Sequence, residues 1–227
     1  MIDTHCHFDM MDNPEDFIKS MSESGHTIIG MTNCPEHFAA GYSIVRSYLR
    51  IRLSLGFHPH VVKEIYTQLS LFDKMEKETS FIGEIGLDFS KNFLSTKEIQ
   101  LQVFEHLCQT LSHKKKIISI HSTKAETEVL SFIEKYSLKT PILHWYTGPL
   151  DLVDQAIALG CYFSINESMT LTYKGKRIIS KLPPDRILTE SDAPFNRHSN
   201  IERAISNVNI NASLILQNFR RLLSTLS

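Results

Sequence analysis

Two histidines near the start of the chain, His5 and His7, are separated by a single residue. In a strand, alternate side chains point to the same face, so we expect Asp3, His5 and His7 to share one face. Each neutral imidazole offers a nitrogen lone pair, and divalent first-row metals bind imidazole readily. The pattern therefore predicts a metal site at the first strand; the alternative is a coincidental pair of histidines at a frayed terminus.

Further histidines and carboxylates occur where later apolar segments end. A single residue of this kind carries little information, but an ordered set over several strands predicts one shared site if the strands converge. The set comprises His5, His7, His58, His60, Glu84, Asp88, His121, His144 and Asp192.

Eight short apolar segments alternate with longer segments of helical periodicity. The expected strands are Ile2–Phe8, His26–Thr32, Ile51–Phe57, Phe81–Leu87, Ile117–His121, Pro141–Trp145, Cys161–Ile165 and Arg186–Glu190. The expected helices are Pro14–Ser24, Glu36–Tyr48, Val61–Glu78, Thr96–Ser112, Lys124–Tyr136, Pro149–Leu159, Thr170–Leu182 and Asn200–Leu226.

This alternation implies parallel strands joined by crossovers, and eight such units predict an α/β fold, the (β/α)₈ TIM barrel. An open doubly wound sheet is the alternative, but its usual glycine-rich phosphate loop does not follow the first strand. With 227 residues the chain is a short variant of a fold whose typical size is about 250 residues. In such a barrel the carboxyl ends of all strands meet at one face, where sites on this fold lie.

Composition favours one domain over residues 1–227, because no linker or low-complexity run divides a chain that is 42% hydrophobic. The net charge of -1 argues against a broad basic face that coats DNA, but not against a nuclease with a local metal-charged groove. Four widely spaced cysteines predict reduced core residues rather than disulfides. Without a signal-like start or a long apolar run, we expect a cytoplasmic protein with no membrane association.

The motifs, taken together and in order, resemble those of a known family. They are the His-x-His start, GFHPH at 56–60, GEIGLDF at 83–89, the lone His121, HWYTG at 144–148 and TESDAP at 189–194. Over Met1–Pro194 this pattern is similar to the TatD-like metal-dependent deoxyribonucleases of the amidohydrolase superfamily. The resemblance implies a (β/α)₈ barrel, in agreement with the periodicity.

The resemblance also implies two divalent metal ions, Mg²⁺, Mn²⁺ or Zn²⁺, and phosphodiester hydrolysis. His5, His7, Glu84 and Asp192 would hold one ion, while Glu84, His121 and His144 would hold the other. Glu84 would bridge the ions, because a carboxylate has two oxygens for two cations. Asp192 would also take the proton of the attacking water. The expected substrate is DNA, single-stranded or at strand ends, degraded from 3′ to 5′.

Several neighbouring residues are expected to bind substrate or to orient the ligands. His58 and His60 would line the active face, although a structural loop is an equal alternative for His58. Asp88 would orient a histidine ligand or cap a loop. Trp145 and the adjacent Tyr146 would stack on an unpaired base, or pack in the core.

The chain departs from the family pattern at two places. Thr123 stands where an arginine is usual, and Lys124 or Lys91 would compensate as a point charge without bidentate geometry. After Asp192 the family has a longer segment, whereas here Arg197 and His198 are either replacements or an exposed loop pair. The basic run at 114–116 ends an expected helix, where positive charge complements the helix dipole.

Two other functions remain open. The same site could hydrolyse another bond, such as the ester of D-aminoacyl-tRNA or a small phosphoester, because fold and metals do not determine the substrate. Alternatively, the chain is a metal-binding partner protein with little turnover. Short TatD-like proteins also resemble the nuclease components of Qat phage-defence systems, which implies operon partner proteins and a role in antiviral defence.

Overall fold

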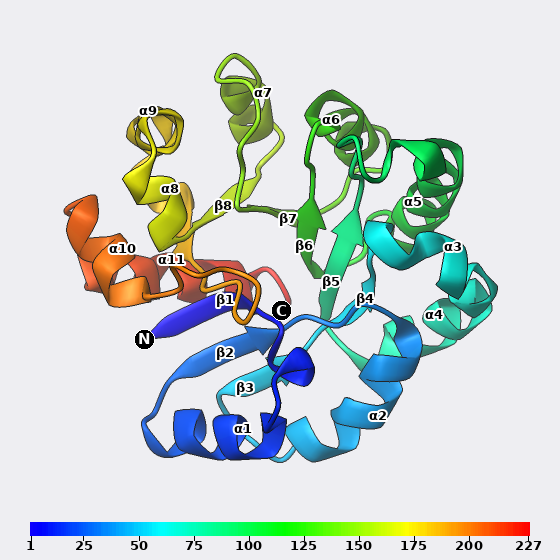
Figure 1. Cartoon of the computed structure of the whole chain (residues 1–227), viewed down its shortest axis with the longest axis horizontal. Coiled ribbons are helices and arrows are strands. Elements are labelled where there is room, and N and C mark those ends of the chain that lie inside the picture. The colour runs from blue at the N-terminus through cyan, green and yellow to red at the C-terminus, as the bar shows by residue number, and fades with distance from the viewer.

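Short parallel strands form a ring at the centre of the molecule, and helices surround the ring (Figure 1). The computed structural model describes all residues, Met1–Ser227. The strands are β1 (Ile2–Cys6), β2 (Thr27–Gly30), β3 (Ile51–Leu53), β4 (Leu55–Phe57), β5 (Phe81–Gly86), β6 (Ile117–His121), β7 (Thr140–His144), β8 (Tyr162–Ile165) and β9 (Ile187–Thr189). The α-helices are α1 (Pro14–Glu23), α2 (Pro35–Val45), α3 (Val62–Ile65), α4 (Leu69–Met75), α5 (Lys97–Leu111), α6 (Glu126–Lys135), α7 (Leu152–Ala158), α8 (Glu167–Leu171), α9 (Tyr173–Lys181), α10 (Ile201–Asn207) and α11 (Ala212–Ser224).

The strands lie in chain order around the ring and are hydrogen-bonded in two sheets, β1-β2-β3 and β4 to β9. Only Ser54 separates β3 from β4, so the segment predicted as one strand, 51–57, passes from one sheet to the other. The ring is therefore built from eight strand segments, and the predicted (β/α)₈ barrel is confirmed. Each predicted strand is present, with bounds that differ by a few residues.

Hydrogen bonds join β1 and β9 at the seam of the barrel. The Thr4 hydroxyl donates to the carbonyl of Thr189, and the backbone N–H of Asp192 donates to the carbonyl of His5 over 2.9 Å. The N–H of His7 donates to the carbonyl of Ala193 over 2.8 Å. These bonds bring the His-x-His segment against the Asp192 segment, which lies about 185 residues away in the sequence.

Three of the predicted helices are broken. The segment 170–182 contains the end of α8 and the whole of α9, with Thr172 between them. The segment 61–78 forms α3 and α4 with 3₁₀ turns between and after them, including η4 (Glu76–Glu78). The final segment forms α10 and α11, because Asn209 adopts a positive φ of 52° and Asn211 caps α11 by accepting from the N–H of Ser213. Asparagine tolerates the left-handed region and competes with helix interior hydrogen bonds, so it favours such breaks.

The apolar core fills the space between the strands and the helices. α5 illustrates the packing, because Val103, Phe104, Leu107 and Leu111 recur at helical spacing and are buried. All four cysteines are buried and free, as predicted. Tyr146 is also buried and donates to the carbonyl of Pro149, so its core interpretation is the correct one. None of the helices has the length and hydropathy needed to cross a bilayer.

Candidate metal centre

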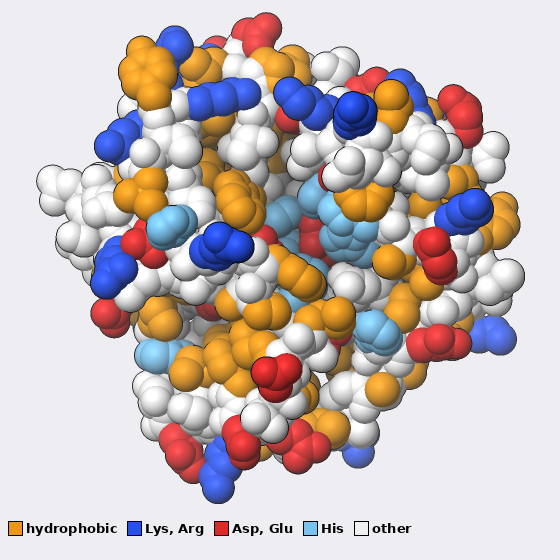
Figure 2. Space-filling view, in the orientation of Figure 1, with side chains coloured by type: hydrophobic (Ala, Val, Ile, Leu, Met, Phe, Trp, Pro, Cys, Tyr) orange, Lys and Arg blue, Asp and Glu red, His pale blue; other side chains and the backbone are white.

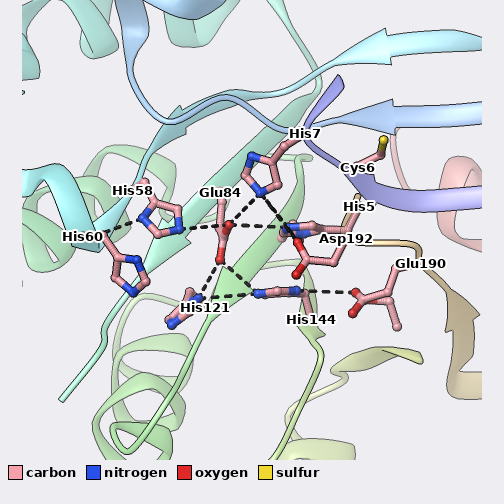
Figure 3. Close-up of polar contacts among 12 residues, drawn as sticks. His5, Cys6, His7, His58, His60, Glu84, His121, His144, Glu190 and Asp192 are labelled. Carbon is pink, nitrogen blue, oxygen red and sulfur yellow. Dashed lines mark hydrogen bonds and ion pairs between the residues drawn. The ribbon is translucent and has the colours of Figure 1, made fainter. Parts of the chain in front are cut away.

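Glu84 lies at the centre of a cluster of histidines at the carboxyl end of the barrel (Figure 3). Its Oε2 is 3.4 Å from Nε2 of His5 and 3.1 Å from Nε2 of His7. Its Oε1 is 2.7 Å from Nδ1 of His121 and 3.0 Å from Nε2 of His144. The two carboxylate oxygens thus face two different histidine pairs, one from β1 and its end and one from β6 and β7.

The first pair does not follow simple strand alternation. The pairing of β1 with β2 shifts register between Asp3 and Cys6. His5 and His7 reach Glu84, whereas Asp3 does not. Asp3 accepts from the N–H of Ser191 and lines a separate cavity beside α1. The prediction that Asp3 shares the face of the two histidines is therefore wrong, because the irregular pairing interrupts the alternation.

Asp192 approaches the same pair from the end of β9. Its Oδ1 is 3.6 Å from Nε2 of His5 and 3.9 Å from Nε2 of His7. Burial raises the pKa of Asp192 to about 7, and nearby Glu190 and Glu84 also raise it, while the positive form of His144 lowers it. This side of Glu84 therefore combines two imidazoles with a carboxylate that binds a proton readily.

The charge of Glu84 itself is stabilised by its neighbours. Burial raises the pKa of Glu84, but the surrounding His58, His144 and His5 and the hydrogen bond with His121 outweigh this effect. The pKa of Glu84 consequently lies well below its usual value, and the side chain is an anion although only 2% of it is exposed.

The second pair is supported by carboxylates behind it. Nε2 of His121 lies 2.9 Å from Oδ2 of Asp88, and Nδ1 of His144 lies 3.5 Å from Oε2 of Glu190. Glu190 is fully buried and accepts from Nδ2 of Asn166 over 2.8 Å and from the hydroxyl of Ser164. Such carboxylates orient an imidazole and increase its basicity as a ligand.

Glu190 is a residue that the sequence analysis missed. It stands two positions before Asp192, and the alternation of side chains along a strand was the available signal that both face the same interior. Burial lowers the pKa of His144, but the charges of Glu84 and Glu190 raise it by more than burial lowers it. The pKa of His144 therefore lies well above its ordinary value.

The predicted substrate residues His58 and His60 also lie in the cluster. Nε2 of His58 is 3.1 Å from Oε2 of Glu84, and burial lowers the pKa of His58 to about 4, so its ring is neutral. Nε2 of His60 is 2.7 Å from Oδ2 of Asp88, and its ring stacks on Phe93 at 3.6 Å between centroids. Asp88 therefore holds both His60 and His121, which agrees with an orienting role.

The donor set fits divalent cations. Ligand atoms lie within 4.8 Å of one another in the groups His5–His7–Glu84, His5–His144–Asp192, His58–Glu84–His121 and His60–Asp88–His121. Imidazole nitrogens with carboxylate oxygens suit Zn²⁺ and Mn²⁺, and a cation would offset the buried negative charge.

A cavity of about 620 Å³ opens above the cluster, and Figure 2 shows histidine and acidic atoms at the bottom of the corresponding hollow. Its wall includes Trp145 together with Met10, Phe195 and Thr123. No lysine or arginine lines it, and Lys124, predicted to bind substrate, is exposed outside the lining. The cavity has the size of a small-molecule or nucleotide site.

Comparisons with known proteins agree with this geometry. Residues 2–223 match the family model "TatD related DNase". The metal-dependent hydrolase YjjV of Escherichia coli is 26% identical over 208 residues, which cover 85% of this chain and 79% of that protein. Its crystal structure, described as a TatD homolog, superposes with a TM-score of 0.86 and covers 100% of this chain and 97% of the other.

Two further relatives carry nuclease names. Human deoxyribonuclease TATDN3 is 23% identical over 237 residues, which cover 96% of this chain and 86% of that protein. The 3′-5′ ssDNA/RNA exonuclease TatD of Escherichia fergusonii is 26% identical over 164 residues, which cover 67% of this chain and 61% of that protein. Since the family model spans almost the whole chain, this protein belongs to the TatD-related DNase family.

Proposed function

We propose that this chain is a metal-dependent hydrolase that cleaves phosphodiester bonds of DNA, releasing nucleotides from single-stranded 3′ ends. The observation that carries the proposal is the position of Glu84, whose two oxygens face separate histidine pairs with Asp192 beside one of them. The nuclease names of two relatives support the choice of bond.

Two divalent ions would be held around Glu84. His5, His7 and Asp192 would bind on the Oε2 side, and His121 and His144 on the Oε1 side. The chemistry supplied by bound ions would be positive charge at the phosphate oxygens and a lowered pKa for the attacking water.

The chain's own residues then move the proton and position the substrate. Asp192 accepts the proton of the attacking water at its carboxylate, and bound cations beside it would keep this carboxyl deprotonated and ready to accept. His58, neutral and beside Glu84, orients the phosphate or the water. Trp145 lines the cavity wall and stacks on the terminal base.

The test is degradation of single-stranded DNA labelled at either end, with Mg²⁺, Mn²⁺ or chelator. The variant Glu84→Gln keeps the shape of the side chain but removes the charge, and Glu105→Gln, an exposed glutamate paired with Lys135, is the matched control. We expect metal-dependent shortening from the 3′ end by wild type and the control only. Cleavage by Glu84→Gln at the wild-type rate would contradict the two-metal assignment, and no cleavage by wild type with any metal would contradict the nuclease proposal.

A second candidate is hydrolysis of another ester, such as D-aminoacyl-tRNA or a small phosphoester. The observation that favours it is the absence of lysine and arginine from the cavity wall, which Thr123 lines at the position where the family resemblance predicts an arginine. A panel of these substrates at equal metal concentration separates the candidates. Metal binding without turnover of any substrate would instead support the partner-protein role in a defence system, to be tested by deletion and phage plating.

A further inference from the structure

The cavity alone cannot neutralise a nucleic-acid strand. Each nucleotide carries one phosphate charge, but the cavity wall has no lysine or arginine. Metal ions at Glu84 would act on the phosphate being cleaved, not on those that follow it. The rest of a nucleic-acid strand must therefore leave the cavity across its rim, and the charge on each side of the rim determines which side the strand follows.

The two sides of the rim carry opposite charge. The stretch 9–23, which includes α1, contains five acidic residues and one lysine, whereas α9 contains four basic residues and no acidic one. Figure 2 shows lysine and arginine side chains gathered above the hollow, over α6 to α9, and mostly aspartate and glutamate below it, over α1. A polyanion leaving the cavity is repelled on the α1 side and attracted on the α9 side.

Hydrogen bonds connect the cavity wall to the basic side of the rim. The loop that carries Phe195 is held against α8, since Ser168 donates to Oδ1 of Asn196 over 2.7 Å and the N–H of Asn200 donates to Oε2 of Glu167 over 3.2 Å. α9 begins two residues after α8 ends. The loop of the cavity wall and the start of α9 are therefore linked through α8.

This surface combines aromatic and cationic side chains. Tyr173 is 79% exposed, and the guanidinium of Arg177 lies 5.7 Å from the centre of its ring. Lys174 and Arg177 are exposed and form no ion pair, unlike Lys181, which is 2.7 Å from Asp154. An exposed ring beside free cations is the combination that holds bases by stacking and phosphates by charge.

We propose that single-stranded nucleic acid extending from the cavity binds along this surface, the α9 ridge, formed by Phe195, Arg197, Leu171, Tyr173, Lys174 and Arg177. Phe195 is 58% exposed at the cavity and Leu171 is 53% exposed before α9, so apolar contacts continue between the cavity and Tyr173. The inference rests on the proposed function, because it assumes that the cleaved bond belongs to a nucleic acid.

The experiment measures binding and hydrolysis separately. Fluorescence anisotropy of labelled oligodeoxythymidine, with chelator to prevent cleavage, is recorded over a range of salt concentrations for wild type, Tyr173→Ala and the double variant Lys174→Glu/Arg177→Glu. The control is Lys77→Glu/Lys139→Glu. It reverses the charge at two exposed, unpaired lysines that precede β5 and β7, at the opposite end of the barrel. Hydrolysis of the p-nitrophenyl ester of thymidine 5′-phosphate with Mn²⁺ reports on the metal centre alone.

We expect the double ridge variant to bind about tenfold more weakly at low salt, and its plot of log affinity against log salt to be shallower by about 0.7 for each lost phosphate contact. Tyr173→Ala should weaken binding about fivefold or more through lost stacking. The control should bind like wild type, and all variants should hydrolyse the small ester equally.

Two results would overturn the ridge proposal: equal losses in the ridge and control variants, or no binding of the oligonucleotide by wild type. Failure of the proposed function looks different, because wild type would then hydrolyse neither the small ester nor DNA while the anisotropy measurements still report on the ridge.

Discussion

Two glutamates, one before β5 and one within it, are equally buried but have different partners. Glu76 and Glu84 are each 2% exposed. Glu76, in the η4 turn before the strand, accepts from Lys114 over 2.6 Å and lies 2.8 Å from Nζ of Lys116. Glu84, within the strand, is surrounded by imidazoles instead.

The partners of the two glutamates indicate different roles, stability for Glu76 and metal binding for Glu84. A lysine keeps its proton at neutral pH, so Glu76 has permanent counter-ions and has no free oxygen for a metal. An imidazole can be neutral and can offer a lone pair, so the histidines around Glu84 can bind a metal ion together with its carboxylate. The amino-terminal end of the barrel is thus stabilised by fixed charges, while the carboxyl end is arranged for chemistry.

The largest effect that tests this comparison is expected for Glu84→Gln. Activity should fall by about a thousandfold or more, because metal ions contribute several kcal/mol to the transition state. Mn²⁺ should raise the melting temperature of wild type, through preferential binding to the folded state, but not that of the variant. Glu76→Gln is the matched control and should keep both responses. A normal metal-induced shift in Glu84→Gln would contradict the assignment.

A smaller effect is expected for the carboxylates behind the second histidine pair. Glu190→Gln and Asp88→Asn should each lower the affinity for Mn²⁺ by about 10- to 100-fold, measured by calorimetry, because they no longer orient and polarise His144 and His121. Asp73→Asn is a useful control, since Asp73 holds His106 at 3.0 Å away from the cluster. An equal loss of affinity in the control would show that the effect is not specific to the site.

The smallest effect is expected for the stability of Glu76→Gln. This variant leaves Lys116, whose side chain is 12% exposed, without its carboxylate partner. The free energy of unfolding in urea at neutral pH should fall by about 1–3 kcal/mol, with activity unchanged. Lys114 contributes less to this loss, because its side chain is 40% exposed and solvent screens its charge.

The pH dependence of this loss follows from the pKa of Glu76. Burial raises the pKa, but the hydrogen bonds and charges of Lys114 and Lys116 outweigh this effect and hold the pKa of Glu76 below its ordinary value. A carboxyl with a lower pKa in the folded state stabilises the protein fully above its unfolded pKa, and this contribution disappears as the pH falls through the folded value. The difference between wild type and Glu76→Gln should therefore shrink in acid, and a constant difference would contradict the ion-pair explanation.

Local patterns in the sequence were sufficient for the barrel and for the residues that meet at Glu84. Strand ends converge in this fold, so His5, His121 and His144 could be grouped once the strands were counted. The orientation of Asp3 could not be predicted, because it depends on a register shift between β1 and β2 that no local pattern encodes. The break between α10 and α11 was indicated only by asparagines, which helices also tolerate.

The second layer of the site was harder to predict than the first. Glu190 contacts His144, which is distant in the sequence, and its hydrogen-bond donors Asn166 and Ser164 come from β8 and its end. Lys124, by contrast, was predicted to compensate for the absent arginine at Thr123, but its backbone adopts a positive φ of 59° and its side chain lies outside the cavity lining. Beyond the end of a strand, closeness in the sequence to a site residue does not predict the direction in which a side chain points.

The seam between β1 and β9 has a consequence for when the protein becomes active. His5 and His7 belong to the first barrel strand and its end, whereas Asp192 is synthesised only after the last barrel strand. A nascent chain therefore lacks a complete set of proposed metal ligands until the hydrogen bonds of Asp192 and Ala193 to the β1 segment form. A metal held from both sides of the seam would join these two segments, so that closure of the barrel and completion of the proposed metal site would be one event.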